Sequence, residues 1–463
     1  MQTIARFDAD LIQRYGLNGP RYTSYPTAVS FHEGFDEVAY RQYAVKTNED
    51  FIPKPLSLYV HLPFCHSLCY YCGCNKKITR HSRHGEDYLY WLDREIALQG
   101  PLFDRDREVM QLHFGGGTPT FFDDDQLERL MGWLGRDFRL SESEEREFSI
   151  EIDPRTVDPA RLERLAGLGL NRLSLGVQDL DPEVQAAVNR IQGAEETLAL
   201  IDASRRAGFG SVSIDLIYGL PKQTLESFSR TLDTIIEAAP DRLSVYNYAH
   251  LPDLFRSQRL IREEDLPEPA VRLELLQCTI ERLGAAGYVY IGMDHFALPD
   301  NELVAARDTG QLQRNFQGYS TFADCDLVGL GVSAIGKVGD TYSQNRKDIR
   351  SWRRSLQDGA LPVWRGVQLT WEDRLRRRVI EQIMCHGALD FESIGEAFDI
   401  EFSEHFAPEL EALDLLHRDG LIVLDDDGFQ VTPGGMLLVR AIAMVFDEAL
   451  QAARATPKFS KVI

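Results

Sequence analysis

From residue 57 the chain repeats one pattern, in which a short apolar or β-branched run precedes an amphipathic stretch with helical spacing. In one such stretch Leu273, Leu276, Ile280 and Leu283 recur at the spacing of a single buried helix face. The runs predict strands at 57–63, 111–114, 147–153, 172–178, 211–219, 242–250 and 288–296. The stretches between them predict helices at 86–99, 124–138, 183–190, 194–207, 225–238 and 270–284. This alternation predicts an α/β fold with a partial or complete parallel (β/α) barrel.

The pattern divides the chain into an N-terminal arm (1–50), the barrel (51–358) and a smaller, mainly helical C-terminal domain (359–463). The arm contains a segment, 20–26, that its two prolines make extended or turn-like. The last domain is predicted to form helices near 372–385, 391–398 and 408–419, a hairpin at 421–424 and 429–432, and a final helix near 433–452.

Three helices and a hairpin also fit a winged-helix domain, which would suggest DNA binding. The hairpin tip carries Asp425, Asp426 and Asp427. These carboxylates would repel phosphates, which DNA-binding domains contact through Lys or Arg. We therefore favour a lid or packing domain.

Polar residues and glycines follow or end the predicted strands, where parallel α/β folds place their chemistry. The segment 64–76 follows the first strand, and Gly115 to Gly117 with Thr118 follow the second. The later strands carry Glu151, Asp153, Gln178, Asp215, Asn247 and His250. Buried carboxylates and amides are costly without partners. We therefore expect a polar ligand across the mouth of the barrel.

Four of the seven cysteines lie in the segment 64–76, and Cys65, Cys69 and Cys72 among them have C-x3-C-x2-C spacing. Thiolates at this spacing can converge on one soft metal centre. Iron–sulfur clusters that only carry electrons usually take four cysteines, one for each iron. Three ligands would leave one iron open to bind and act on a small molecule.

Other interpretations of these cysteines stay open on spacing alone. A disulfide framework is disfavoured, because seven cysteines in 463 residues is a low density. A structural zinc site commonly uses two C-x2-C pairs, and the sequence has no second pair. Cys74, His61 or His66 could still be a fourth ligand of zinc or of a closed cluster.

The cysteine spacing resembles the radical S-adenosylmethionine (SAM) enzymes, in which three cysteines hold a 4Fe-4S cluster and SAM binds the fourth iron. The string from Tyr59 to Lys76 is similar to the oxygen-independent coproporphyrinogen III oxidase family, and the likeness runs from Gly19 to Ile463. The resemblance implies that Cys74 is not a ligand. It implies a catalytic set of Tyr59 and the three cluster ligands, Cys65, Cys69 and Cys72.

The resemblance also implies two SAM molecules per chain. The SAM on the cluster would contact Tyr59, Tyr71, Gly116, Glu151 and Ile335. The second SAM would contact Gly117, Thr118, Gln178, Arg190, Asp215 and Ala249. Elementary chemistry agrees in outline, since Asp215 could bind a ribose or an ammonium group and Arg190 a carboxylate.

The reaction implied by the resemblance is the oxidative decarboxylation of two propionates of coproporphyrinogen III, which yields protoporphyrinogen IX in haem biosynthesis. An unidentified low-potential donor would reduce the cluster, which would cleave SAM to a 5′-deoxyadenosyl radical. Two alternatives use the same scaffold: a haem-binding chaperone without turnover, and a related radical SAM enzyme acting on haem. Cys74, segment 20–26 and the second SAM set favour the oxidase over the chaperone.

The composition restricts the partners. With 50 basic and 72 acidic residues the formal charge is −22, which disfavours nucleic acids and anionic membranes. No apolar run reaches the roughly 18 residues of a spanning helix, and the first residues lack a signal-peptide pattern. We expect a soluble, cytoplasmic protein, and a monomer.

Coproporphyrinogen III carries four propionates, so a negatively charged chain would repel it. Exposed charges are largely screened beyond about 8 Å in physiological salt, so local groups should decide binding. We expect a basic pocket at the barrel mouth, with Arg21 as the best candidate and Arg314 and Arg346 as weaker ones. Alternatively, Arg21 only ties the arm to the barrel.

Overall fold

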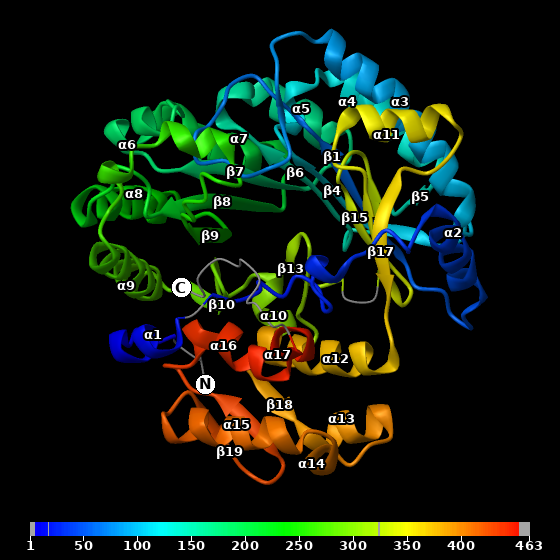
Figure 1. The fold of residues 1–463 in the computed structure, drawn as a ribbon. Helices are drawn as coiled ribbons and strands as arrows, with labels where there is room; N and C mark the ends of the chain where they lie inside the picture. The colour runs from blue at the N-terminus through cyan, green and yellow to red at the C-terminus, as the bar shows by residue number, and fades with distance from the viewer. Residues whose placement is uncertain (1–4, 17, 323–324, 453–463) are drawn as a thin grey trace.

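The computed structural model describes residues 5–16, 18–322 and 325–452, and a single curved sheet forms its centre (Figure 1). Each strand of its main part pairs in parallel with its neighbours. These strands are, in spatial order, β1 (Leu56–Leu62), β4 (Glu108–Gly116), β6 (Glu147–Ile152), β7 (Arg172–Gln178), β8 (Ser211–Tyr218) and β9 (Arg242–Asn247). The predicted α/β class with a parallel sheet is confirmed.

Further strands extend the sheet at both ends. Beyond β1 lie β14 (Asp326–Leu330), which is parallel to β1, and the antiparallel strands β15 (Ile335–Val338), β16 (Thr341–Asn345) and β17 (Val363–Gln368). Beyond β9 lies a hairpin of β11 (His295–Ala297) and β10 (Val289–Gly292). No pairing joins β10 to β17 in the described residues, so the barrel is partial.

The hairpin corrects the single strand predicted at 288–296. Gly292 has φ +148° and Met293 has φ +54°, so the backbone leaves the extended conformation at these two residues. The chain therefore reverses, and β11 rather than β10 pairs with β9.

Helices cover the outer face of the sheet (Figure 1). In α4 (Asp124–Asp137) the fully buried residues Leu127, Leu130 and Leu134 lie on one face, and Asp123 caps the helix together with Gln126. The other covering helices are α3 (Arg83–Gln99), α5 (Pro159–Gly167), α6 (Pro182–Ala187), α7 (Ala194–Ala207), α8 (Leu225–Ala238) and α9 (Pro269–Ala285). Apolar side chains of the strands meet these helices, among them Phe114, Ile150, Leu175, Ile214 and Leu243.

The inner face of the sheet is polar, because alternate residues of each strand point to opposite faces. A cavity of about 170 Å³ lies inside the barrel. Its wall includes His113 of β4 and four serines of the following strands, Ser149, Ser174, Ser213 and Ser244. The interior is thus not a packed apolar core and has room for polar groups.

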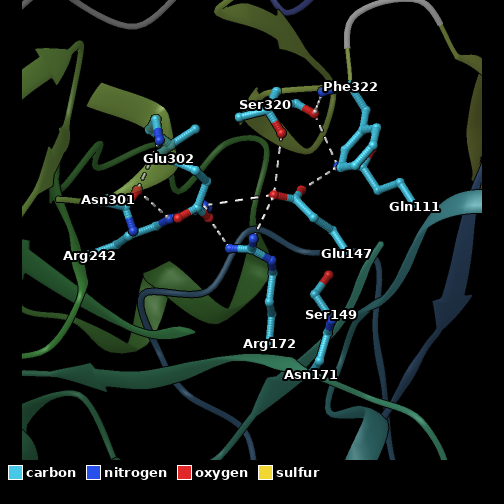
Figure 2. Close-up of polar contacts among 12 residues, drawn as sticks. Gln111, Glu147, Ser149, Asn171, Arg172, Arg242, Asn301, Glu302, Ser320 and Phe322 are labelled. Carbon is cyan, nitrogen blue, oxygen red and sulfur yellow. Dashed lines mark hydrogen bonds and ion pairs between the residues drawn. The ribbon is translucent and has the colours of Figure 1, made fainter. Parts of the chain in front are cut away.

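A partly buried charge cluster lies at the N-terminal ends of the strands, opposite the predicted site (Figure 2). Glu147 lies 3.1 Å from Arg172 and 3.8 Å from Arg242, and Gln111 donates a hydrogen bond of 3.1 Å to its carboxylate. Both arginines also contact Glu302 of α10 (Glu302–Asp308). Two carboxylates therefore balance two guanidinium groups at the base of the barrel.

The C-terminal region forms a separate layer (Figure 1) of α12 (Trp371–His386), α13 (Phe391–Phe398), α14 (Phe402–His405), α15 (Ala407–Arg418) and a small sheet. In this sheet β20 (Gly428–Val431) pairs with both β18 (Ala388–Asp390) and β19 (Ile422–Leu424). The single helix predicted at 433–452 is wrong. The chain instead forms α16 (Val439–Ala443) and α17 (Glu448–Ala452), because Asp447 between them is extended and accepts a hydrogen bond from Tyr22.

The N-terminal arm begins with α1 (Ala9–Tyr15), and α2 (Glu37–Lys46) precedes the barrel. Residues 19–20 are buried, and Arg440 of α16 donates hydrogen bonds to the carbonyl groups of Gly19 and Pro20. The arm is thus clamped between the barrel and the C-terminal layer. The domain boundaries stay predictions; since β17 pairs with β16, the structure favours a boundary after Gln368 over one at 358.

Among the helices that the structure describes, none combines the length and the apolar character needed to cross a bilayer. The predicted similarity at residues 459–463 lies outside the described residues.

Candidate active site

A pocket of about 290 Å³ lies at the C-terminal ends of β4, β6, β7 and β8. Cys65, Cys69 and Cys72, from the loop after β1, form part of its wall. The structure brings to the same wall eight further residues of the predicted site: Tyr71, Gly116, Gly117, Thr118, Glu151, Gln178, Arg190 and Asp215. Residues far apart in the sequence thus surround one space.

The cysteine loop is fixed against the glycine segment by backbone hydrogen bonds. Gly117 donates to Leu62 at 2.9 Å, and Thr118 donates to Phe64 at 2.8 Å. A Cβ atom at Gly117 would lie 2.8 Å from the backbone of Pro63, so only glycine allows this approach. Gly117, directly after β4, therefore fixes the start of the loop that carries the first cysteine.

Polar and positively charged groups surround the thiols. Thr118 donates to Cys65 Sγ at 3.4 Å, while Arg190 and Arg155 lie 3.5 and 3.8 Å from Cys69 Sγ. Burial raises the pKa of Cys65 to about 11, whereas the hydrogen bond from Cys74 and the charge of Lys76 lower the pKa of Cys72. Nearby cations stabilise the thiolate form that binds metal.

The donor set fits an iron–sulfur cluster. Among the described residues, no three His, Cys, Asp or Glu side chains converge on a point that could hold one metal ion. In an iron–sulfur cluster each thiolate binds a different iron, and the three cysteines are spread around one pocket, which suits three irons of a 4Fe-4S cluster. Within the described part of the chain, the buried Nε of Arg190 has no hydrogen-bond partner, as expected where a ligand supplies it.

Glu151 is positioned to bind a cationic or hydroxyl group. Gly116 N–H donates to it at 3.0 Å, and His113 Nε2 lies 3.2 Å from its other oxygen. Burial alone would raise the pKa of Glu151, but His113 and the Gly116 N–H outweigh burial and lower it. The carboxylate is therefore anionic at neutral pH.

Arg190 and Asp215 lie on neighbouring parts of the wall. Arg190 forms an ion pair with Asp153 at 3.2 Å and donates to the carbonyl group of Gly176. Asp215 accepts a hydrogen bond of 2.9 Å from Ser174, and burial raises its pKa to about 6. An anionic Asp215 is thus costly without a ligand that supplies a positive or hydrogen-bonding group.

Three predicted site residues lie outside the pocket wall. Tyr59 of β1 stacks on His113, with ring centres 5.8 Å apart, and hydrogen bonds to His61 at 3.0 Å. Ala249 follows β9 and lines another cavity, of about 440 Å³. Ile335 of β15 packs against a small apolar cluster that includes Tyr342. Contacts of these residues with SAM stay predictions.

Sequence reasoning missed several wall residues, including Ser174, Gly176 and Tyr246. Alternation along β7 could have identified the first two, because Ser174, Gly176 and Gln178 share one face of the strand. Tyr246 precedes Asn247, the last residue of β9, and points to the opposite face of that strand. Cys74 also lines the pocket, although it is predicted not to bind the cluster.

The three arginines proposed to bind substrate differ in position. Arg21 forms an ion pair with Asp294 and lies over the ring of Tyr246, 5.8 Å from its centre. Arg314 of β12 (Gln313–Asn315) donates to the carbonyl oxygen of Arg21 at 3.3 Å. Arg346 follows β16 and does not line the pocket or the 440 Å³ cavity. Of the three arginines, only Arg21 and Arg314 lie next to each other.

Comparisons with known proteins show which family the chain belongs to. Residues 59–235 match the model of the Radical SAM superfamily, and residues 369–438 match that of the HemN C-terminal domain. The chain is 52% identical over 461 residues to the oxygen-independent coproporphyrinogen III oxidase of Pseudomonas aeruginosa, with 99% of each chain covered. It is 49% identical over 457 residues to the oxidase of Escherichia coli, with 99% of this chain and 98% of that one covered.

A solved structure gives the same result. The coproporphyrinogen III oxidase of Escherichia coli, described as a radical SAM enzyme, superposes with a TM-score of 0.92 and 48% identity. The match covers 96% of this chain and 100% of that chain. Radical SAM enzymes use a 4Fe-4S cluster and SAM, which suits the cysteine pocket. The chain belongs to the oxygen-independent coproporphyrinogen III oxidase family of radical SAM enzymes.

Proposed function

We propose that this enzyme converts coproporphyrinogen III to protoporphyrinogen IX without oxygen, by oxidative decarboxylation of two propionates in haem biosynthesis. The observation that carries the proposal is identity of about half the residues with oxidases of this name along the whole chain. The cysteine and glycine segments at one pocket supply the matching chemistry. An unidentified low-potential donor would supply the electron.

Cys65, Cys69 and Cys72 would hold the 4Fe-4S cluster. When bound, the cluster and SAM supply the radical that takes a hydrogen atom from the substrate. The chain itself binds and orients: the Gly116 backbone allows close approach, and the anionic Glu151 can hold an ammonium or ribose group. Enclosure by the sheet, the arm and the C-terminal layer would exclude water from the reaction.

A second SAM would be bound by Gly117, Thr118, Gln178, Arg190 and Asp215, which line the pocket, and by Ala249 beyond β9. Two of these residues carry charge of opposite sign, as a ligand with both a carboxylate and an ammonium group requires. Arg190 also contacts Cys69, so its removal would disturb both SAM positions. The described hydrogen bonds of Asp215 include none to a cysteine. Substitution of Asp215 therefore tests the second SAM site more selectively than substitution of Arg190 does.

The Asp215→Asn enzyme is expected to bind one equivalent of SAM instead of two, because the amide cannot pair with a cation. Equilibrium dialysis with the reconstituted, cluster-loaded protein measures the stoichiometry, and iron analysis confirms the cluster. Asp308→Asn, an exposed aspartate of α10, is the matched control and should keep both equivalents. Loss of both equivalents from Asp215→Asn would show that the predicted sets form one site.

Turnover tests the proposed function directly. Reduced, reconstituted enzyme incubated anaerobically with SAM and coproporphyrinogen III should form protoporphyrinogen IX, and Cys69→Ser protein should form none. Haem in place of the porphyrinogen should remain unchanged. Conversion of haem, or tight haem binding without turnover of either compound, would contradict the proposal.

We further propose that the enzyme is a monomer and acts in the cytoplasm. A reducing compartment suits thiolate ligands of a cluster, which oxidation would destroy. Sedimentation of the full chain should give a mass near 52.6 kDa. A mass of twice this value would contradict the monomer.

A further inference from the structure

A second cavity, of about 440 Å³, lies beside the cysteine pocket, and we refer to it as the arm chamber. Segments far apart in the chain form its wall. The arm contributes Arg21, α9 contributes Arg272, the turn between β10 and β11 contributes Asp294, and α16 contributes Arg440. The chamber therefore exists only when the arm and the C-terminal layer are both in place.

The wall of the arm chamber is basic. Among the described wall residues other than Arg440, which binds the arm backbone, Arg21 and Arg272 face one carboxylate, that of Asp294. Asp294 pairs with Arg21, whereas Arg272 donates to the carbonyl oxygen of Pro267 and forms no ion pair within the described residues. The local balance is thus positive in a chain whose formal charge is −22.

This charge is held in partly buried surroundings, where it is costly. Burial, together with the charges of Arg21 and Arg314, lowers the pKa of Arg440 to about 9. Burial and Arg314 likewise lower the pKa of Arg21. Like charges gathered in a low dielectric destabilise one another unless an anion compensates them. Such a cluster of arginines is expected in a site whose ligand supplies the compensating negative charges.

The arm chamber is next to the reacting centre. Arg21 lines the chamber and lies over Tyr246, and Tyr246 lines the cysteine pocket. A molecule whose carboxylates contact the chamber arginines can therefore extend past Tyr246 towards the cluster loop. Guanidinium groups bind carboxylates with two parallel hydrogen bonds, which would also fix the orientation of the molecule.

We infer that the arm chamber binds the two propionates that coproporphyrinogen III keeps, with Arg21 and Arg272 as the groups that contact them. This inference rests on the proposed function, in which two of four propionates react and two remain. Within the described wall, Arg272 has no carboxylate partner and Arg21 has only that of Asp294, so each guanidinium group can take one substrate carboxylate. A second SAM that reaches Ala249 would touch the edge of the chamber but would not neutralise its arginines, because its sulfonium and ammonium groups outnumber its single carboxylate.

The test compares two non-reacting porphyrins on the full-length reconstituted enzyme. Coproporphyrin III carries four propionates, and mesoporphyrin IX carries only the two that correspond to the retained pair. We expect Arg272→Gln and Arg21→Gln each to raise the Kd of both porphyrins by about tenfold, as read from porphyrin fluorescence. Arg272→Lys, which keeps the charge, should lose less affinity, and Arg353→Gln, at an exposed pair with Asp87, should lose none.

Three results would overturn the inference. A loss of affinity confined to coproporphyrin III would mean that the chamber holds the reacting propionates. Unchanged affinity for both porphyrins in correctly folded variants would mean that it is no carboxylate site. Displacement of mesoporphyrin by SAM, together with a SAM affinity that Arg272→Gln lowers, would assign the chamber arginines to SAM. Turnover by the wild-type enzyme is measured separately. If the proposed function were wrong but the inference right, no product would form, and the arginine variants would still bind both porphyrins more weakly.

Discussion

Serine in place of Cys65, Cys69 or Cys72 is expected to abolish both the visible absorbance of the cluster and all turnover. In the proposed site each thiolate would bind a different iron, so one missing ligand would leave two open irons instead of the one that SAM requires. The hydroxyl of serine ionises far less readily than a thiol and is a poor replacement. Anaerobic reconstitution followed by iron analysis and absorption spectroscopy measures the loss.

Cys74→Ser is the informative control, because Cys74 lines the same pocket as the three predicted ligands. We expect this variant to keep its full iron content and its ability to cleave SAM. If it lost about a quarter of its iron or more, Cys74 would be a fourth ligand, and the open iron for SAM would not exist. Cys278→Ser, at a half-buried position in α9, controls for the substitution itself.

The fold was predictable wherever one periodicity governed a whole element. The strand 172–178 and the helix 194–207 coincide with β7 and α7, because their apolar residues recur at intervals of two and of three to four. Prediction failed where tertiary contacts break an element. The helix expected at 433–452 is interrupted at Asp447, whose partner Tyr22 lies 425 positions earlier in the chain.

The sequence predicted those site residues that lie at the ends of strands. In a parallel sheet these ends meet at one edge, so Glu151, Gln178 and Asp215 could be placed together from their strand positions. The arm chamber could not, because Arg21, Arg272 and Arg440 belong to three segments whose packing no periodicity reveals. Arg21 was proposed as a substrate group because the four propionates require local cations at the barrel mouth, whereas Arg272 and Arg440 carried no sequence signal.

The second large expected effect is a loss of stability on substitution in the charge cluster at the base of the barrel. Glu147→Gln is expected to lower the free energy of unfolding by about 3 kcal/mol, because two guanidinium groups would then share the single carboxylate of Glu302. The side chain of Glu147 is only 7% exposed, so water cannot compensate the lost charge. Urea unfolding of the full chain, followed by tryptophan fluorescence, measures the change.

Glu302→Gln removes the other carboxylate of the same cluster and should cost less, since its side chain is 36% exposed and water screens the remaining charges. Cluster iron and SAM binding should be unchanged in folded Glu147→Gln protein, because Glu147 begins β6 whereas Glu151 near the end of β6 lines the pocket. A loss of stability no larger for Glu147→Gln than for Glu302→Gln would mean that burial does not set the strength of this cluster. A loss of SAM binding would instead show that the base of the barrel and the pocket are coupled through the polar cavity between them.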